Sequence, residues 1–346
     1  MLDNMSNKAI LAKARAMFGK NLDANDYKEL LRRQTVPEIA AYLKHETHYK
    51  DVLADVEEAL IHRGQLENLL RREVLERYSR LLRFEHSSGD EFYGYMVMKN
   101  EIEQILLCIR LLNSGSSEKY ISWMPGYLIK ICSFDLIKLA KISSFDELLQ
   151  ILSDTPYGAI IERFKPQNGE IVDVSACEAA LMTYYYQKLL SAVKKHFKGD
   201  TQSQLVKMIN SEIDLYNIMV IYRLKKYFNS SEQYIHARLI PIKTALSGLI
   251  FKTCLTEPEP ERFLQWLKNR RVSRHFDSQS IENLEQLTAK ISIYRARKNM
   301  RFSVEAPVVL FSFMILMNAE VENIINVIEG KRYKVSDSVI EKLLLS

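Results

Sequence analysis

The chain has 346 residues with only 11 Gly and 8 Pro, which disfavours a β-sandwich, barrel or propeller because those folds depend on many tight turns. Hydrophobic residues make up 47% and charged residues 26%, with a mean hydropathy of −0.16, as in globular proteins of two or three domains. The formal charge of +5 is a mild excess, so no nucleic-acid partner is expected.

The first residues carry charges at Lys8, Lys13 and Arg15 and have no apolar signal segment, so we expect a cytoplasmic protein. Apolar residues then recur at three- and four-residue spacing, which predicts long amphipathic helices. Two such stripes are Leu30, Leu31, Ile39, Leu43 and Leu66, Leu69, Leu70, Val74, Leu75, Tyr78, Leu81, Leu82.

Helix ends are predicted where glycine, proline and serine gather. These places are 114–117, 125–126, 166–169, 199–200 and 257–260. Ser144 is expected to open a new helix, because a serine cap with an acid three residues later, Glu147, is typical of a helix start.

One helical segment occurs three times, and its mark is an acid three residues before an amide. The pairs are Glu101 with Gln104, Asp214 with Asn217, and Glu320 with Asn323. Their amides lie 113 and 106 residues apart, which is far longer than the period of short helical repeats. Because positions i and i+3 share a helix face, we interpret each pair as a latch that hydrogen-bonds a neighbouring helix within its unit.

A second mark recurs with the same period. Tyr42-Leu43 precede Thr47 and Tyr49, Ile151-Leu152 precede Thr155 and Tyr157, and Trp266-Leu267 more faintly precede Phe276. The two threonines are 108 residues apart. Two marks with one order and one period predict three related helical units, at 1–118, 119–233 and 234–346.

The sequence lacks a Gly-rich phosphate loop and the His-Glu-x-x-His, Gly-x-Ser-x-Gly and Cys-x-x-Cys motifs, so no cofactor or catalytic residue is predicted. His45, His48 and Asp51 could form a zinc or nickel site on one helical face, but an exposed polar face is the favoured interpretation. The same holds for Glu58 and His62. The cysteines, which are expected to be reduced core thiols, are Cys108, Cys132, Cys177 and Cys254.

The longest apolar run, 308–317, is too short to span a bilayer and predicts a buried helix, so no direct membrane span is expected. Basic residues gather in two clusters of the last third, Lys268, Arg270, Arg271, Arg274 and Arg295, Arg297, Lys298, Arg301. Solvated helix faces are the simpler interpretation of these clusters, and an acidic partner is the functional one.

The repeats resemble a known family. The stretch Asp214-x-x-Asn217-Ile-x-x-Ile221-x-Arg223-x-Lys225 and the stretch Glu320-Val-Glu-Asn323-Ile-x-x-Val327-x-x-Gly330-Lys331 are similar to the helix motif of the C subunits of bacterial and archaeal V-type (A-type) ATPases, which are called d subunits in eukaryotes. The opening also resembles this family, through Ala12 to Met17, Leu22, Tyr27, Leu30-Leu31, Val36 to Ile39, Leu43, Thr47 and Tyr49, and Thr155 to Tyr157 is similar to its middle unit. This chain departs from it at Ile325, where the family often has Arg, and at Gln104, which replaces Asn.

The resemblance implies an all-α funnel of three pseudo-threefold units around a central cavity, without catalytic residues. It implies a central-stalk rotor subunit, cytoplasmic and peripheral to the membrane, that couples shaft subunits of the D/F type to the membrane proteolipid ring. The motor would move H⁺ or Na⁺ in an ATP-driven or ATP-yielding direction. Arg270, Arg271, Arg274, Arg295, Arg297 and Arg301 are the candidate partner-binding residues.

Two other classes of protein remain open on the residues alone. An unrelated helical scaffold or repeat protein would bind peptides in a concave face and would not co-purify with a shaft subunit and a proteolipid ring. An enzyme would rest on His45, His48 and Asp51, and would carry stoichiometric metal that is lost in His48→Ala.

Overall fold

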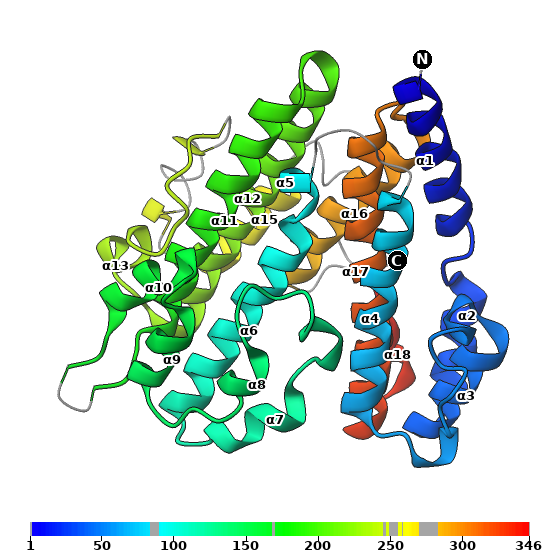
Figure 1. The fold of residues 1–346 in the computed structure, drawn as a ribbon, viewed down its shortest axis with the longest axis horizontal. Coiled ribbons are helices and arrows are strands. Elements are labelled where there is room, and N and C mark those ends of the chain that lie inside the picture. Colours follow the sequence, from blue (N-terminus) through cyan, green and yellow to red (C-terminus); the bar gives the residue numbers. More distant parts are fainter. Residues whose placement is uncertain are drawn as a thin grey trace. The chain divides into compact units, whose positions relative to one another are not determined.

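The computed structural model describes residues 2–83, 90–167, 170–244, 247–248, 255–257, 259–269 and 283–345. Every regular element within these ranges is a helix, which confirms the predicted all-α class (Figure 1). The chain forms two compact units. The split unit combines 1–87 with 264–346, and the middle unit is 88–263. The finer division into three units at 118 and 233 stays a prediction.

The split unit is built around one long helix, α17. Its helices are α1 (Leu2–Phe18), α2 (Ala24–Arg32), α3 (Val36–Glu46), α4 (Arg63–Leu82), α16 (Leu284–Phe302), α17 (Ala306–Arg332) and α18 (Asp337–Leu343), with the 3₁₀ turns η1 (His48–Lys50) and η2 (Glu58–Leu60). α17 packs against α1, α4, α16 and α18. Helices from both ends of the chain therefore share one core.

The apolar character of α17 is explained by its packing. Of the helices that the structure describes, α17 alone is long and apolar enough to cross a membrane, but 78% of an apolar 18-residue window in it is buried by the rest of the protein. The predicted buried helix over 308–317 is confirmed as part of this longer element.

The apolar stripe from Leu30 to Leu43 belongs to two helices rather than one. The first helix ends at Arg32, and Thr35 starts the second because its Oγ1 accepts a hydrogen bond from Glu38 N at 3.3 Å, with Pro37 in the first turn of α3. A threonine cap followed by a first-turn proline starts a helix. The spacing predicted the buried face correctly, while the cap decides where the chain turns.

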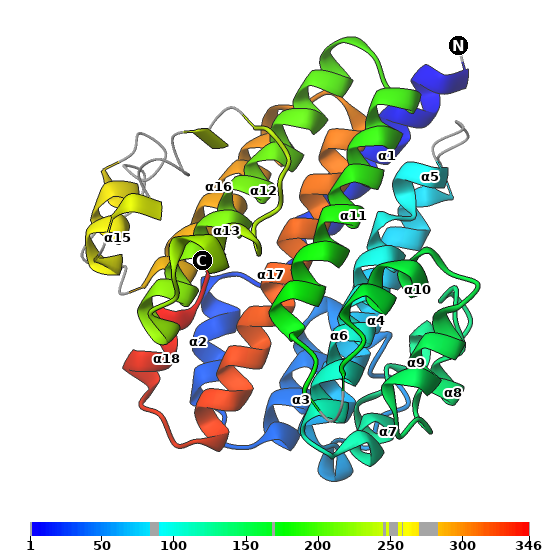
Figure 2. The same ribbon diagram turned by 90° about the vertical axis from the view of Figure 1, so that its left-hand side faces the viewer.

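The middle unit has three long helices and a group of short ones (Figure 2). Its helices are α5 (Asp90–Tyr93), α6 (Tyr95–Asn113), α7 (Tyr120–Trp123), α8 (Leu136–Leu139), α9 (Phe145–Leu152), α10 (Pro156–Ile161), α11 (Val174–His196), α12 (Gly199–Phe228) and α13 (Glu232–His236), with η3 (Ser117–Lys119), η4 (Gly126–Leu128) and η5 (Glu162–Phe164). α11 packs against both α6 and α12. α15 (Pro260–Lys268) contains the boundary between the two units.

Most predicted helix ends agree with the structure. α6 ends at Asn113, α11 ends at His196 and α12 begins at Gly199. At α9, Glu147 N donates to Ser144 Oγ at 3.3 Å, and Ser143 N donates to Glu147 Oε2 at 2.7 Å. The predicted ends at 166–169 and 257–260 fall partly outside the described residues.

A glycine sets the tight approach of α10 to the end of α9. A Cβ at Gly158 would lie 2.5 Å from the Leu152 carbonyl oxygen, closer than real Cβ contacts allow. Tyr157, the residue before it, is buried. The absence of a side chain at 158 therefore helps to place Tyr157 in the core.

The described cysteines are free thiols. Cys108 and Cys177 are buried and Cys132 is half-buried. Burial raises the pKa of each of the three thiols to about 12, so they stay protonated and unreactive at neutral pH. Cys254 lies outside the described residues.

Candidate functional site

Glu101 of the first acid–amide pair is buried and anchors two segments of the middle unit to α6. Its Oε2 accepts from the Tyr157 hydroxyl at 2.6 Å, and its Oε1 accepts from Ser133 N. One turn further on, Gln104 Oε1 accepts from the Tyr120 hydroxyl at 3.0 Å. The pair thereby holds the α7–α10 region against the long helix.

Glu320 of the third pair does the same work in the split unit. Its Oε2 accepts from Leu22 N at 2.7 Å, and its Oε1 accepts from the Tyr49 hydroxyl at 2.9 Å and lies 2.6 Å from His48 Nε2. Asn323 follows one turn later on α17. Its Oδ1 accepts from Leu345 N at 2.7 Å, and its Nδ2 donates to the Tyr27 hydroxyl at 3.3 Å.

Asp214 and Asn217 of the second pair face the chain that follows α12. Ile240 N donates to Asn217 Oδ1 at 2.8 Å, while Asn217 Nδ2 donates to the Ile240 carbonyl at 3.1 Å. The Asp214 carboxylate accepts from the Thr244 hydroxyl. Asp214 and Asn217 are both buried. Each of the three pairs thus places a carboxylate and an amide on one helix face and uses them to hold a separate segment; we refer to them as the Glu101, Asp214 and Glu320 latches.

The two marks found in the sequence meet in space, which sequence reasoning missed. The tyrosine of the second mark donates to the acid of the first, as Tyr157 to Glu101 and Tyr49 to Glu320. The predicted units grouped Tyr49 with Glu101, whereas the structure joins each of these acids to a tyrosine of a different predicted unit. The equal period of the two marks was the available signal, but a period gives order along the chain and no contact.

Burial changes the pKa of the tyrosines that bind the Glu101 and Glu320 latches. Removal from water raises the pKa of Tyr49 and of Tyr157 well above the ordinary value, helped next by the charge of Glu320 at Tyr49 and by the hydrogen bond to Glu101 at Tyr157. Both phenols therefore remain protonated and donate to their glutamates throughout the neutral range. A buried carboxylate that accepts several hydrogen bonds is a strong and specific anchor.

The expectation of an exposed polar helical face is wrong for His48, whereas His45 and His62 are exposed as expected. α3 ends at Glu46 and His48 opens η1, so His45, His48 and Asp51 do not share a helical face. The turn at η1 directs the His48 side chain inward, where it is only 3% exposed, while His45 stays exposed and lies 3.1 Å from Glu58. His62, which was paired with Glu58 in the sequence, instead caps the start of α4. Among the described residues there is no group of three or more His, Cys, Asp or Glu side chains arranged to hold a metal ion.

Part of the predicted basic surface lies on α16. Arg297, Lys298 and Arg301 are exposed there, and Arg295 is half-buried. Arg270, Arg271 and Arg274 lie outside the described residues. Partial burial and the neighbouring charge of Arg301 lower the pKa of Arg297, although a guanidinium keeps its charge at neutral pH.

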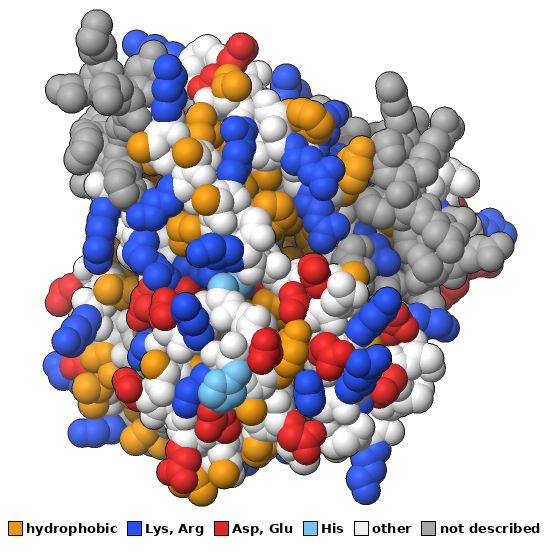
Figure 3. Space-filling model, turned by 90° about the vertical axis from the view of Figure 1, so that its right-hand side faces the viewer, with side chains coloured by type: hydrophobic (Ala, Val, Ile, Leu, Met, Phe, Trp, Pro, Cys, Tyr) orange, Lys and Arg blue, Asp and Glu red, His pale blue; other side chains and the backbone are white. Residues whose placement is uncertain are grey.

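α1 extends this positive region. Arg15 ties α1 to the end of α16 by donating to the Met300 carbonyl at 2.8 Å and the Ser303 carbonyl at 2.7 Å. Neither 7–22 nor 288–304 contains a single Asp or Glu, and together they carry nine Lys and Arg residues: Lys8, Lys13, Arg15, Lys20, Lys290, Arg295, Arg297, Lys298 and Arg301. In the view of Figure 3, Lys and Arg crowd the upper part, where α1 lies, and acids are more frequent below. We call this region the α1–α16 basic surface.

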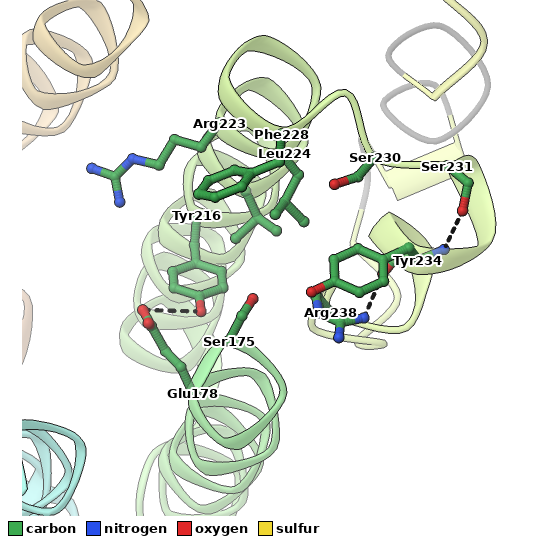
Figure 4. A pocket seen from close by; sticks show the side chains of 11 residues that line it. Ser175, Glu178, Tyr216, Arg223, Leu224, Phe228, Ser230, Ser231, Tyr234 and Arg238 are labelled. Atoms are coloured by element: carbon green, nitrogen blue, oxygen red, sulfur yellow. Dashed lines mark hydrogen bonds between the residues drawn. The ribbon is translucent and has the colours of Figure 1, made fainter. Parts of the chain in front are cut away.

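The middle unit contains an open cleft of about 430 Å³ between α12, the start of α11 and α13. Figure 4 shows Tyr216 and Glu178 on one wall, with a hydrogen bond of 3.4 Å between them, and Tyr234 with Arg238 on the other. Leu224 and Phe228 add apolar surface. Such a mixture of aromatic walls and a few polar groups can accept a side chain or a small organic group.

The described part of the chain is thus a helical protein in which a repeated acid–amide helix anchors the segments around it. The sequence matches the family described as "ATP synthase (C/AC39) subunit" over residues 10–343. The chain belongs to this family, which agrees with the resemblance seen in the repeats.

Named relatives support this membership. The C subunit of the A-type ATP synthase of Methanosarcina acetivorans is 25% identical over 351 residues, covering 97% of this chain and 91% of the relative. The protein of the same name from Methanosphaera stadtmanae is 26% identical over 217 residues, covering 62% of this chain. That alignment spans about half of the relative, 53% of its length.

Proposed function

We propose that this chain is a non-catalytic rotor subunit of the central stalk of an A/V-type ATPase. In this role it couples the D/F-type shaft to the proteolipid ring on the cytoplasmic side of the membrane, while the complex moves H⁺ or Na⁺ and consumes or yields ATP. The observation that carries the proposal is the family match over almost the whole chain, 10–343.

The latches support a mechanical role. A part that transmits torque has to keep its segments from sliding, and buried hydrogen-bonded carboxylates resist sliding because any shift leaves donors unpaired. Glu101, Asp214 and Glu320 each hold a distant segment against a helix of 19 residues or more. Stiffness is then distributed over both compact units.

The order of the latches supports three related units around a central opening. Each of the first two acid helices holds the segment that follows it along the chain, as Glu101 holds Tyr157 and Asp214 holds Thr244. The last acid, Glu320, holds Tyr49 from the start of the chain. When the last unit of a repeat pairs with the first, the units are connected as in a closed ring.

The α1–α16 basic surface is proposed to dock on an acidic surface of a partner subunit in the same complex. Nine cations without an intervening acid favour an anionic partner over a neutral one, because complementary charge steers association and opposes wrong partners. Arg297 and Arg301 are its test residues, since Arg15 has a structural task at the end of α16.

Co-purification tests the role itself. The full chain, tagged and expressed with the other subunits of its complex, is expected to capture a D/F-type shaft and a proteolipid ring in defined stoichiometry. Capture of neither assembly by a folded chain would refute the rotor role.

Charge reversal tests the basic surface. Arg297→Glu with Arg301→Glu should weaken capture about tenfold at 0.1 M salt and remove most of its salt dependence. Lys207→Glu on α12, also an exposed cation, is the matched control and should bind as the parent protein does. Equal capture and equal salt dependence for the double variant and the control would contradict this docking surface.

A peptide-binding scaffold is the second candidate function, and the cleft beside α13 favours it. An apolar peptide side chain could enter between Leu224 and Tyr234. A scaffold would bind short peptides with Tyr234→Ala weakening that binding, and it would not capture a shaft and ring.

A further inference from the structure

The middle unit exposes a group of apolar side chains on α7, on α8 and in the turn that follows η4. Fifteen large apolar residues are exposed within the described ranges, and five of them fall in the seventeen residues 121–137. These five, with their exposed fractions, are Ile121 (62%), Trp123 (53%), Ile129 (37%), Ile131 (45%) and Ile137 (48%). Scattered exposed apolar residues are ordinary, whereas a concentration of this kind marks an interaction surface.

The packing of the short helices fixes this exposure. In α7 the Tyr120 side chain is buried and its hydroxyl donates to Gln104 Oε1, so Ile121 and Trp123 point away from the core. In α8 Leu136 and Leu139 are buried, which turns Ile137 outward. Figures 1 and 2 both place α7 and α8 close together at the lower end of this unit.

Lysines surround the exposed apolar residues. Residues 117–141 contain four exposed lysines, Lys119, Lys130, Lys138 and Lys141, against two acids, Glu118 and Asp135. Asp135 is engaged at the start of α8, where its Oδ1 accepts from Ile137 N and Lys138 N and its Oδ2 lies 4.0 Å from Lys138 Nζ, an exposed ion pair. We call residues 117–141 the 117–141 face.

This combination of side chains has a specific chemical counterpart. Tryptophan and isoleucine gain free energy by entering the headgroup boundary of a bilayer, and lysine stems reach from apolar surroundings to lipid phosphates. A hydrophilic acidic partner would leave the isoleucines in water, and an uncharged apolar partner would gain nothing from the lysines. An anionic bilayer surface accepts both.

We propose that the 117–141 face binds the surface of an anionic phospholipid bilayer. Trp123 and Ile121 enter the headgroup region, and Lys130 and Lys138 contact lipid phosphates. This inference goes beyond the proposed rotor role and does not rest on it.

Tryptophan emission provides the test. The chain has two tryptophans, so Trp266→Phe leaves Trp123 as the only reporter in the full-length protein. With phosphatidylcholine vesicles containing about one third phosphatidylglycerol, the emission should shift to the blue and be quenched by brominated acyl chains. Vesicles of phosphatidylcholine alone, or high salt, should reduce both effects because the lysine contribution is screened.

Variants separate the apolar and charged contributions. In vesicle sedimentation, Trp123→Ser should reduce binding at least about tenfold, and Lys130→Gln with Lys138→Gln should reduce it several-fold. Ile171→Ser, which alters a 75% exposed isoleucine of the same unit, and Lys207→Gln are matched controls that should leave binding unchanged.

Three results would overturn the proposal. They are an unshifted Trp123 emission at saturating anionic vesicles, an equal effect of Trp123→Ser and Ile171→Ser, and burial of Trp123 in a protein complex while protein-free vesicles are ignored. A failure of the rotor proposal gives a different result: the protein would still bind vesicles but would not capture the shaft and the ring.

Discussion

The Glu101 and Glu320 latches use the same chemistry over very different distances along the chain. Each carboxylate accepts from a backbone N–H and from a tyrosine hydroxyl. Tyr157 lies 56 residues from Glu101, whereas Tyr49 lies 271 residues from Glu320. Loop-closure entropy makes the longer connection costlier by about 1.4 kcal/mol, a cost that all contacts between the two parts of the split unit share.

The longer connection also has more hydrogen bonds. Glu320 has the buried His48 as a third contact, whereas Glu101 has two such contacts within the part of the chain that the structure describes. The comparison shows that one local motif can tie together neighbouring segments or opposite ends of the chain. Which of the two it does depends on the segment that the fold brings to its carboxylate.

Removing the acids should produce the largest effects. Glu320→Ala should lower the free energy of unfolding by about 4 kcal/mol and Glu101→Ala by about 3 kcal/mol, because three buried contacts are lost in the first case and two in the second. Hydrogen exchange followed by mass spectrometry reads each compact unit separately. Glu322→Ala, a half-exposed neighbour that pairs with Arg71, is the control and should cost less than about 1 kcal/mol. A larger cost for Glu101→Ala than for Glu320→Ala would reverse the comparison.

Removing the tyrosine hydroxyls should reverse this order, so that the Glu101 latch loses more stability than the Glu320 latch. Tyr157→Phe should cost about 2 kcal/mol and Tyr49→Phe about 1 kcal/mol, since Tyr157 is the described donor to Glu101 Oε2, while Glu320 Oε1 keeps His48 when Tyr49 loses its hydroxyl. Urea unfolding of the two variants checks this. Equal losses of unfolding free energy in the two variants would mean that the contact with His48 does not compensate Glu320 for the lost tyrosine hydroxyl.

The smallest expected effect concerns how the free energy of unfolding depends on pH in alkaline solution. The pKa of Tyr157 is raised above the ordinary value of 10.0, mainly by burial and then by Glu101. Because the pKa of Tyr157 is higher in the folded than in the unfolded chain, the contribution of Tyr157 to the free energy of unfolding is complete below pH 10. It is lost as the pH rises further. Tyr157→Phe should therefore flatten the decline in stability above pH 10. Phe134→Leu, which removes a ring contact of Tyr157 without a titrating group, should lower stability with an unchanged slope.

Several features of the site were predictable from residues alone. The recurring acid and amide identified Glu101, Asp214, Asn217, Glu320 and Asn323, and these residues are buried and hydrogen-bonded in the structure. The helix start at Ser144 and the break between helices near 199–200 followed from local capping and from residues that interrupt helices. Such features depend on residues within a few positions of each other, and a sequence shows those directly.

The latch partners were not predictable in the same way. His48 was expected on an exposed face, yet the turn after Glu46 places it against Glu320. Leu22 N and Ser133 N are backbone donors, so no side-chain pattern could indicate them. The period of the two marks was visible, but the pairing of Glu101 and of Glu320 with a tyrosine of another repeat was not.

The sequence by itself determined the helical class, the buried faces and the acid–amide helices, because helix periodicity and capping are local properties of the chain. The tertiary structure alone decided that Glu320 meets the first fifty residues, and that Ile121 and Trp123 face outward while Tyr120 faces inward. These outcomes depend on which distant segments share a core. That choice is set by the sum of many packing contacts and is written in no single stretch of residues.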